Sequence, residues 1–177
     1  MLAYASGEAQ AFDILYERYR RPLYQFVLHG CSNPAQASEL FQDIWMSVIS
    51  AREQFSNTGT FKSWIYRIAR NALIDFYRKK GNRTHDAFDE EKTFDNVSSI
   101  EAPLSPMELT ELNANREQVQ QAIQSLPWRQ RDALNLKIIA GFTLAEIALE
   151  QGEPVETVKS RLRYAYSKLR QQLRALS

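Results

Sequence analysis

Residues 143–170 read TLAEIALEQGEPVETVKSRLRYAYSKLR, a short amphipathic stretch, a turn and a longer amphipathic stretch. The short stretch ends at Gly152, a residue type that readily adopts the left-handed conformation in which helices often stop. The longer stretch begins near Pro154, which is favoured in the first turn of a helix. Its apolar residues share one face at helical spacing, namely Val155, Val158, Leu162, Ala165, Leu169 and Leu173. Two helices joined in this way indicate a helix-turn-helix.

The polar side of the second helix is basic, because Thr157 to Arg174 contains six Lys or Arg residues and no acid. Arg and Ser side chains can bond to base edges, and Lys and Arg can bond to phosphates. Ser160 and Tyr164 fall nearly opposite the apolar face, with Lys159 and Arg161 at its edges. A solvated helix face is the alternative, and the preceding helix and glycine turn favour DNA. The candidate DNA-binding residues here are Thr157, Lys159, Ser160, Arg161, Arg163 and Tyr164.

The rest of the chain also predicts helices. Of its 177 residues 44% are apolar and 24% charged, which is typical of a globular protein of one or two small domains. Gly and Pro are scarce and separate the apolar-periodic segments, which favours an all-α fold. We expect helices over residues 35–52, 61–80, 129–139, 143–151 and 154–176, a kink or break at Pro22 and a helix stop at Gly30.

The formal net charge of +1 conceals three blocks. Residues 1–83 hold 11 bases and 7 acids, residues 84–118 hold 2 and 9, and residues 119–177 hold 9 and 5. The middle block is polar, contains Pro103 and Pro106, and has weak apolar periodicity. It is therefore expected to be a flexible acidic linker. The predicted fold class is all-α, two small helical domains at 1–83 and 116–177 joined by a linker at 84–115.

Two helices of the first block present candidate binding faces. Residues 61–80 combine basic and aromatic side chains on the face opposite their apolar one, which suits DNA strands and unstacked bases. The polar loop before that helix has room for an unstacked base. The preceding helix has Glu39, Asp43 and Ser47 at four-residue spacing, an acidic face that suits a basic partner helix. A plain solvated face is the alternative for that helix.

Several classes are excluded or disfavoured. No run of 18 apolar residues is present, so no membrane insertion is expected. The N-terminus is unlike a secretory signal, and the one cysteine, Cys31, forbids an internal disulfide, which fits a reducing, cytoplasmic location. The histidines, His29 and His85, form no catalytic or metal-binding set. No phosphate-binding loop or nucleophile elbow occurs. We therefore expect no enzyme activity, no cofactor and no metal.

Taken together, these stretches resemble bacterial RNA polymerase sigma factors of the sigma-70 family, extracytoplasmic-function (ECF) subfamily, which retain conserved regions 2 and 4. The stretch AFDILYERYRRPLYQFV resembles the opening of region 2, and ASELFQDIWMSVI resembles its polymerase-binding segment. FSNTGTFKSWIYRIARNALIDFYRKK resembles the melting loop and the −10 reading helix. SLPWRQRDALNLKIIAGFTLAEIALEQGEPVETVKSRLRYAYSKLR resembles region 4. The matches cover residues 8–81 and 116–173.

The resemblance implies partners and roles. Core RNA polymerase, through its β′ clamp and β subunits, promoter DNA and a cognate anti-sigma protein are the implied partners. The implied polymerase-binding residues are Glu39, Leu40, Gln42, Asp43, Met46 and Ser47. Those implied to bind the −10 element are Asn57, Thr58, Thr60, Ser63, Tyr66, Arg67, Arg70, Asn71 and Arg78. The six candidates in the last helix would read the −35 element.

The implied function is to bring core polymerase to −35/−10 promoters and to promote DNA opening and transcription initiation without performing chemistry. One alternative is a stand-alone helix-turn-helix regulator that uses the first block for sensing or dimerisation. The string WIYRIARN on a basic face and the lack of a dimer seam disfavour it. A second alternative is a protein that only sequesters a partner. Lys159, Arg161 and Arg163, kept on the −35 face, disfavour that reading.

Overall fold

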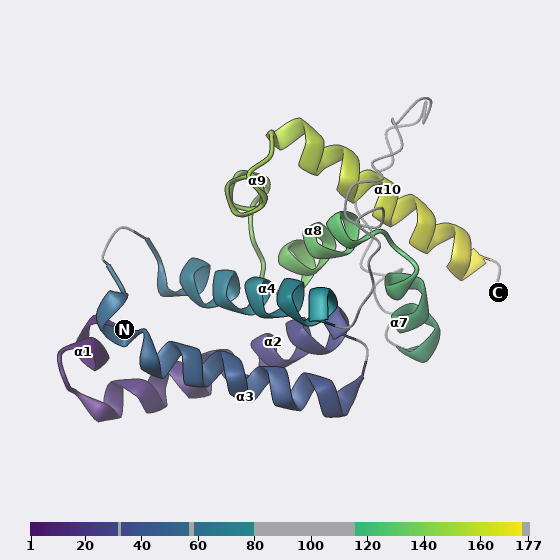
Figure 1. Cartoon of the computed structure of the whole chain (residues 1–177). Helices are drawn as coiled ribbons and strands as arrows, with labels where there is room; N and C mark the ends of the chain where they lie inside the picture. Colours follow the sequence, from purple (N-terminus) through teal and green to yellow (C-terminus); the bar gives the residue numbers. More distant parts are fainter. Residues whose placement is uncertain (32, 57–58, 80–115, 175–177) are drawn as a thin grey trace. The chain divides into compact units, whose positions relative to one another are not determined.

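A computed structural model describes residues 1–31, 33–56, 59–79 and 116–174, with side chains over most of these ranges. All regular secondary structure in those ranges is helical, as the sequence predicts (Figure 1). The chain divides into two compact units, residues 1–82 and 83–177, and each is described by itself. The expected acidic linker at 84–115 lies outside the described residues. No helix in the described ranges is long and apolar enough to cross a membrane.

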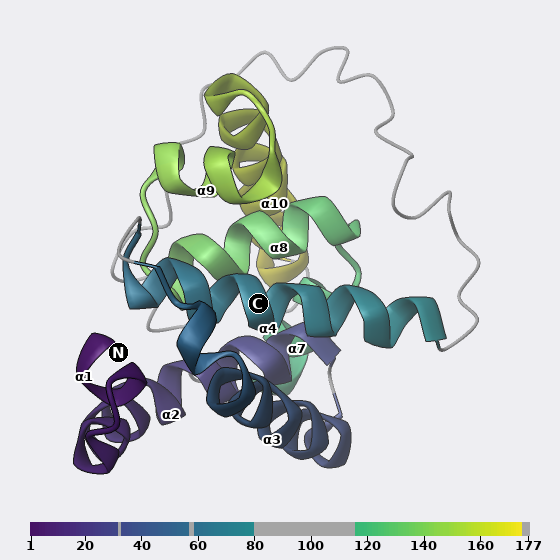
Figure 2. The same cartoon turned by 60° about the vertical axis from the view of Figure 1, so that its left-hand side comes forward.

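The first unit is a three-helix bundle. After the short helix α1 (Leu2–Ala5), the chain forms α2 (Ala9–Cys31), α3 (Pro34–Ser50), a 3-10 turn (Arg52–Gln54) and α4 (Phe61–Lys79). Helices α2, α3 and α4 each pack on the other two, with α4 above the other pair in both views (Figures 1 and 2). Each helix buries one apolar stripe in a common core, whose most buried members include Leu23, Phe26, Val27, Ile44, Val48, Ile65 and Leu73.

Two expectations for α2 need correction. The helix continues through Pro22, so the break expected there is absent; core residues lie on both sides of the proline, Leu15 before it and Leu23, Phe26 and Val27 after it. Gly30 does not stop the helix either. It is a buried helical residue against which Leu73 of α4 packs, and a Cβ atom there would lie 2.5 Å from Leu73 Cδ1. Glycine is needed at this position so that α2 and α4 can approach closely.

Local polar groups fix where the other helices of this unit begin. The Asn33 side chain accepts hydrogen bonds from the backbone N–H groups of Ala35 and Gln36, at 3.0 and 3.1 Å, and Pro34 occupies the first helical turn of α3. Both features are standard helix starts. At α4 the Thr60 hydroxyl accepts the Ser63 N–H at 3.1 Å. The predicted starts of both helices are confirmed to within one residue.

The second unit consists of α7 (Arg116–Gln124), α8 (Trp128–Ile138), α9 (Leu144–Gln151) and α10 (Val155–Arg174). Helix α10 packs on each of the other three. Helices α9 and α10 form the predicted helix-turn-helix. Thr143 and Glu146 form a capping box at the start of α9, and Gly152 ends that helix with a φ of 66°. These signals explain why the helix-turn-helix is predictable from the sequence.

The Gly30 contact predicts a sign change in a double-mutant cycle. Gly30→Ala alone should lower the stability of the first unit by about 1 kcal/mol, since overpacking costs about 1–3 kcal/mol and the gain in helix propensity is at most about 1 kcal/mol. In a Leu73→Ala background, which removes the clashing methyl groups, the same change should be stabilising. Urea unfolding followed by fluorine NMR of a fluorotryptophan-labelled chain checks this, because Trp45 and Trp64 report on this unit alone. A loss of stability in both backgrounds would contradict the Leu73 explanation.

Candidate functional site

The outer face of α3 carries the residues predicted to bind polymerase. Glu39, Gln42, Asp43, Met46 and Ser47 are all exposed, and Leu40 is half-buried. Met46 is 60% exposed, and Asp43 and Glu39 precede it by one and two turns on the same helix face. The Ser47 hydroxyl donates to the Asp43 backbone oxygen at 2.8 Å. The sequence-predicted set therefore lies along one side of α3 and combines two carboxylates with an exposed methionine.

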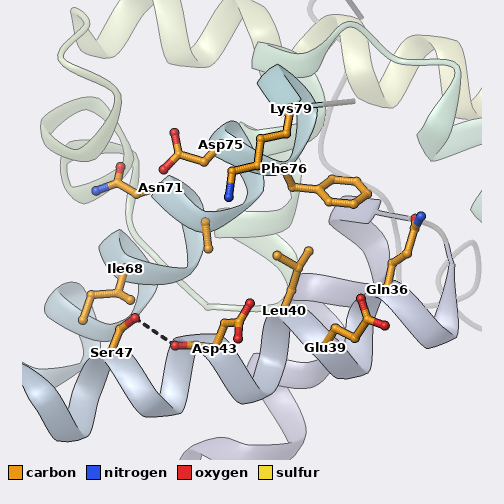
Figure 3. A pocket seen from close by; sticks show the side chains of 11 residues that line it. Gln36, Glu39, Leu40, Asp43, Ser47, Ile68, Asn71, Asp75, Phe76 and Lys79 are labelled. Carbon is orange, nitrogen blue, oxygen red and sulfur yellow. Dashed lines mark hydrogen bonds between the residues drawn. The ribbon is translucent and has the colours of Figure 1, made fainter. Parts of the chain in front are cut away.

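A groove of about 540 Å³ separates this face from α4. Figure 3 shows Glu39, Leu40 and Asp43 on its α3 wall and Asn71 and Asp75 on its α4 wall, with Phe76 and Lys79 at the far end of α4. Three carboxylates and one ammonium group line it, so the groove favours a positively charged occupant. Asn71, predicted to bind the −10 strand, is exposed at its edge.

The other predicted −10 residues are distributed over three environments. Ser63, Arg67, Arg70 and Arg78 follow one another along a stripe of α4 that faces away from the core, and Arg78 forms an exposed ion pair with Asp75 at 3.7 Å. Thr60 is exposed and caps α4, so its hydroxyl already has a structural role. Asn57 and Thr58 lie outside the described residues.

Tyr66 does not belong to this surface, and its assignment as a DNA-binding residue is corrected. Its side chain is only 2% exposed, and its ring packs edge-on against Phe26 with the centroids 5.1 Å apart. Burial, with a smaller contribution from Tyr19, raises the pKa of the phenol well above its ordinary value. The buried side of α4 consists of Ile65, Tyr66, Ala69 and Leu73. The helix is therefore rotated relative to the apolar face that the sequence predicts, and Tyr66 faces the core.

The outer face of α10 is formed by Glu156, Lys159, Ser160, Arg163 and Ser167, and most of the predicted −35 residues lie on it or beside it. Lys159 is exposed and pairs with Glu156 at 2.8 Å across one turn. Thr157, Ser160, Arg163 and Tyr164 are half-buried. Such exposed pairs contribute little to stability, so Lys159 can exchange its carboxylate partner for a phosphate at small cost.

Arg161 is the second correction. Its side chain is completely buried and donates to Gln151 Oε1 at 2.9 Å and to Glu153 Oε1 at 3.0 Å. Helical geometry places it about 60° from Val158 around α10, inside the buried arc rather than at its edge. A guanidinium in that place needs acceptors, and it finds them in the turn between α9 and α10. It therefore points away from the outer face of α10.

The sequence reasoning missed the partners of Arg161. Glu153 also accepts a hydrogen bond from Arg129 of α8, and the Gln151 amide donates to Asp132 Oδ2 at 2.9 Å. We call Arg129, Asp132, Gln151, Glu153 and Arg161 the turn network. The hydrogen bonds and charges of Arg161 and Arg129 lower the pKa of Glu153 against an opposing effect of burial. The sequence did contain one signal for this burial. Arg161 falls within the apolar arc of its helix, and no acid follows it on that helix, so its partners had to come from another element.

Within the described ranges, no cluster of His, Cys, Asp and Glu side chains has the arrangement of a metal site. Comparison with known proteins gives the family of the chain. The model of sigma-70 region 2 matches residues 15–83, and the model of sigma-70 region 4 matches residues 116–169. The ECF sigma factor RpoE of Cereibacter sphaeroides is 30% identical, over 92% of this chain and 86% of its own.

The chain is an ECF sigma factor of the sigma-70 family. It binds core RNA polymerase and promoter DNA and directs the polymerase to promoters, and it is not an enzyme. The ECF sigma factor SigX of Bacillus subtilis is 28% identical, over 78% of this chain and 71% of its own. The structure of CnrH in complex with the cytosolic domain of CnrY has the same fold, with a TM-score of 0.70 at 24% identity over 98% of this chain and 94% of that chain.

The turn network of this sigma factor predicts a pH dependence of stability in the second unit. The folded-state pKa of Glu153 lies below its ordinary value of 4.5, so the ion pairs stabilise the fold fully above that value, and the contribution is lost as the pH falls through the lowered pKa. Glu153→Gln should therefore be less stable than wild type at neutral pH, and the difference should shrink under acid conditions.

Urea unfolding observed at the Trp128 fluorine resonance measures this in the second unit alone. Glu156→Gln, an exposed acid on the neighbouring turn with one i,i+3 partner, is the matched control and should stay close to wild type throughout. A Glu153→Gln deficit that persists unchanged at low pH would show that the carboxylate charge is not what stabilises the turn.

Proposed function

We propose that three surfaces of this sigma factor divide its work. The outer face of α3 docks on the β′ clamp of polymerase, the α4 stripe contacts the −10 strand, and the outer face of α10 reads the −35 element. The single observation that carries this proposal is the α3 face, an exposed methionine beside two carboxylates on a helix whose opposite side is core. A basic helix with an apolar contact point would complement a face of this composition.

The clamp assignment is supported by chemistry as well as exposure. Met46 supplies a flexible apolar anchor, and Glu39 and Asp43 supply charge that would complement a basic helix. Leu40 lies at the margin between this face and the groove. An interface with an apolar centre and charged surroundings has the usual anatomy of a protein–protein contact.

The DNA assignments rest on two solvent-facing basic stripes, whose members are exposed or half-buried. On α4 we assign Ser63, Arg67, Arg70, Asn71 and Arg78 to the −10 strand, with Thr60 and the loop residues Asn57 and Thr58 around a flipped base. On α10 we assign Thr157, Lys159, Ser160, Arg163 and Tyr164 to the −35 duplex. Opening would be driven by binding energy, since flipped, single-stranded bases bind better than stacked ones.

We further propose residues 1–83 as the region 2 domain, 84–115 as the linker and 116–177 as the region 4 domain. CnrH was solved with the cytosolic domain of CnrY, and RpoE of Bartonella quintana with the anti-sigma factor NepR. We propose that an anti-sigma protein likewise controls this chain by binding its polymerase-facing surfaces. A sigma factor acts where polymerase and DNA are, so we assign it to the cytoplasm.

Run-off transcription tests the promoter role and reveals the promoter sequence. Core polymerase with the full chain, on a fragmented genomic library, should give new discrete transcripts that share −35 and −10 sequences. The chain alone should bind those sites weakly and with strong salt dependence. Tight, sequence-specific binding by the chain alone, with no new transcripts, would instead indicate a stand-alone regulator.

Charge reversal on α3 tests the clamp face. Asp43→Lys should weaken binding to core polymerase about tenfold or more, because it opposes a basic partner at the edge of an apolar contact. The matched control is Asp13→Lys, the same charge change at an exposed position of α2, which should leave the affinity within twofold. Fluorescence anisotropy with labelled full chain and core polymerase measures both. Equal effects of the two variants would mean that net charge, rather than this face, governs binding.

A further inference from the structure

The helix expected to read the −35 element contains a basic residue that does not face the solvent. Arg161 lies on the buried side of α10 and is 0% exposed. Lys159, Ser160 and Arg163 lie on the outer side of the same helix. Burying a guanidinium is costly unless it is paired and hydrogen-bonded. The chain buries one in the second turn of α10 and supplies the partners for it, so the position of the arginine calls for a reason other than burial.

The hydrogen-bond partners of Arg161 lie at the end of α9 and in the turn that follows it. Its two terminal nitrogens bond to Gln151 at the end of α9 and to Glu153 in the turn, at 2.9 and 3.0 Å. Glu153 is bonded in turn to Arg129, and Gln151 to Asp132, both on α8. Four polar side chains therefore tie α10 to the turn and, through it, to the helix on which α10 packs.

This arrangement constrains the rotation of α10 about its own axis. Apolar contacts of Val158, Leu162 and Ala165 are non-directional and tolerate small rotations, whereas a planar guanidinium with two bonded acceptors does not. A rotation of the helix moves every outer side chain along the groove. Base-edge hydrogen bonds depend on a narrow range of distance and angle, while contacts to phosphates accept more displacement.

We propose that Arg161 and Glu153 are positioning residues for −35 recognition, which set the rotation of α10 so that its outer face meets the base edges. The proposal rests on the assignment of that face to the −35 element. Under this proposal the two residues affect different properties. Loss of Arg161 reduces sequence discrimination without removing a phosphate contact. Loss of Lys159 removes a phosphate contact without reducing sequence discrimination.

The test uses holoenzyme on a promoter obtained by run-off transcription and on the same promoter with a scrambled −35 element, each over a range of salt concentrations. Arg161→Met should lower the ratio of the two affinities about tenfold, the effect of one lost base contact, with the salt slope unchanged. Lys159→Met, the matched substitution on the outer face, should weaken both promoters alike and reduce the slope by about 0.9. Arg161→Lys, which keeps the charge but loses the fork, should restore the ratio in part.

Each outcome decides a separate point. A slope reduced by Arg161→Met would mean that the side chain leaves the turn to bind phosphate, and an unchanged ratio in a folded variant would mean that it only stabilises the unit. Either result overturns the proposal.

If Lys159→Met and Arg163→Met both leave slope and ratio unchanged, the −35 assignment of α10 itself fails. Should Arg161→Met not fold, Glu153→Gln, which retains an oxygen acceptor, should still lower the ratio with the slope unchanged; a ratio equal to wild type would overturn the proposal.

Discussion

Burial of one guanidinium group constrains how the helices of the second unit meet. Arg161 cannot stay charged under α10 without acceptors, and the chain provides them in the turn that separates α9 from α10. Because Gly152 gives that turn its left-handed step and Glu153 and Gln151 are bonded to α8 as well, the two helices of the helix-turn-helix are fixed by polar groups at their junction. The apolar core then supplies stability without having to supply direction.

In the first unit, helix α4 contributes to both the core and the surface. Helix α4 buries Ile65, Tyr66, Ala69 and Leu73, lines the groove with Asn71 and Asp75, and leaves its arginines on the remaining side. The helix therefore presents three different environments on three sides. The close approach of Leu73 to Gly30 shows how tightly the core side must pack when so small a bundle buries the stripe of each helix.

The helices were predictable because their boundaries are marked by local signals. Asn33, Thr143 and Gly152 act on backbone groups next to them in the chain, so a sequence window contains the whole cause. Pro22 and Gly30 misled the prediction because tertiary contacts between helices outweigh local preference there. Tyr66 and Arg161 misled it for another reason. Both are amphipathic residue types whose polar ends suggest an exposed position, and their burial depends on partners in other elements, Phe26 for Tyr66 and Gln151 with Glu153 for Arg161, that periodicity does not reveal. The members predicted for the α3 face are exposed except for the half-buried Leu40, whereas on α10 only Lys159 is exposed and four other candidates are half-buried, so the roles of both faces stay predictions.

The burial of the charged Arg161 side chain also bears on how a sigma factor can recognise its promoter specifically and still dissociate from it. Affinity from each DNA-reading surface must stay modest, because a sigma factor has to leave its promoter, and binding through several weak surfaces on one polymerase provides strength when they act together. Modest affinity leaves few base contacts with which to discriminate sequences, so each contact must be placed accurately. A buried ion pair suits that demand better than a larger apolar core, since it adds orientation without adding attraction for DNA. Under the proposed roles, an arginine on the buried side of α10 and a lysine on its exposed side would let sequence discrimination and phosphate affinity vary independently within the same two turns.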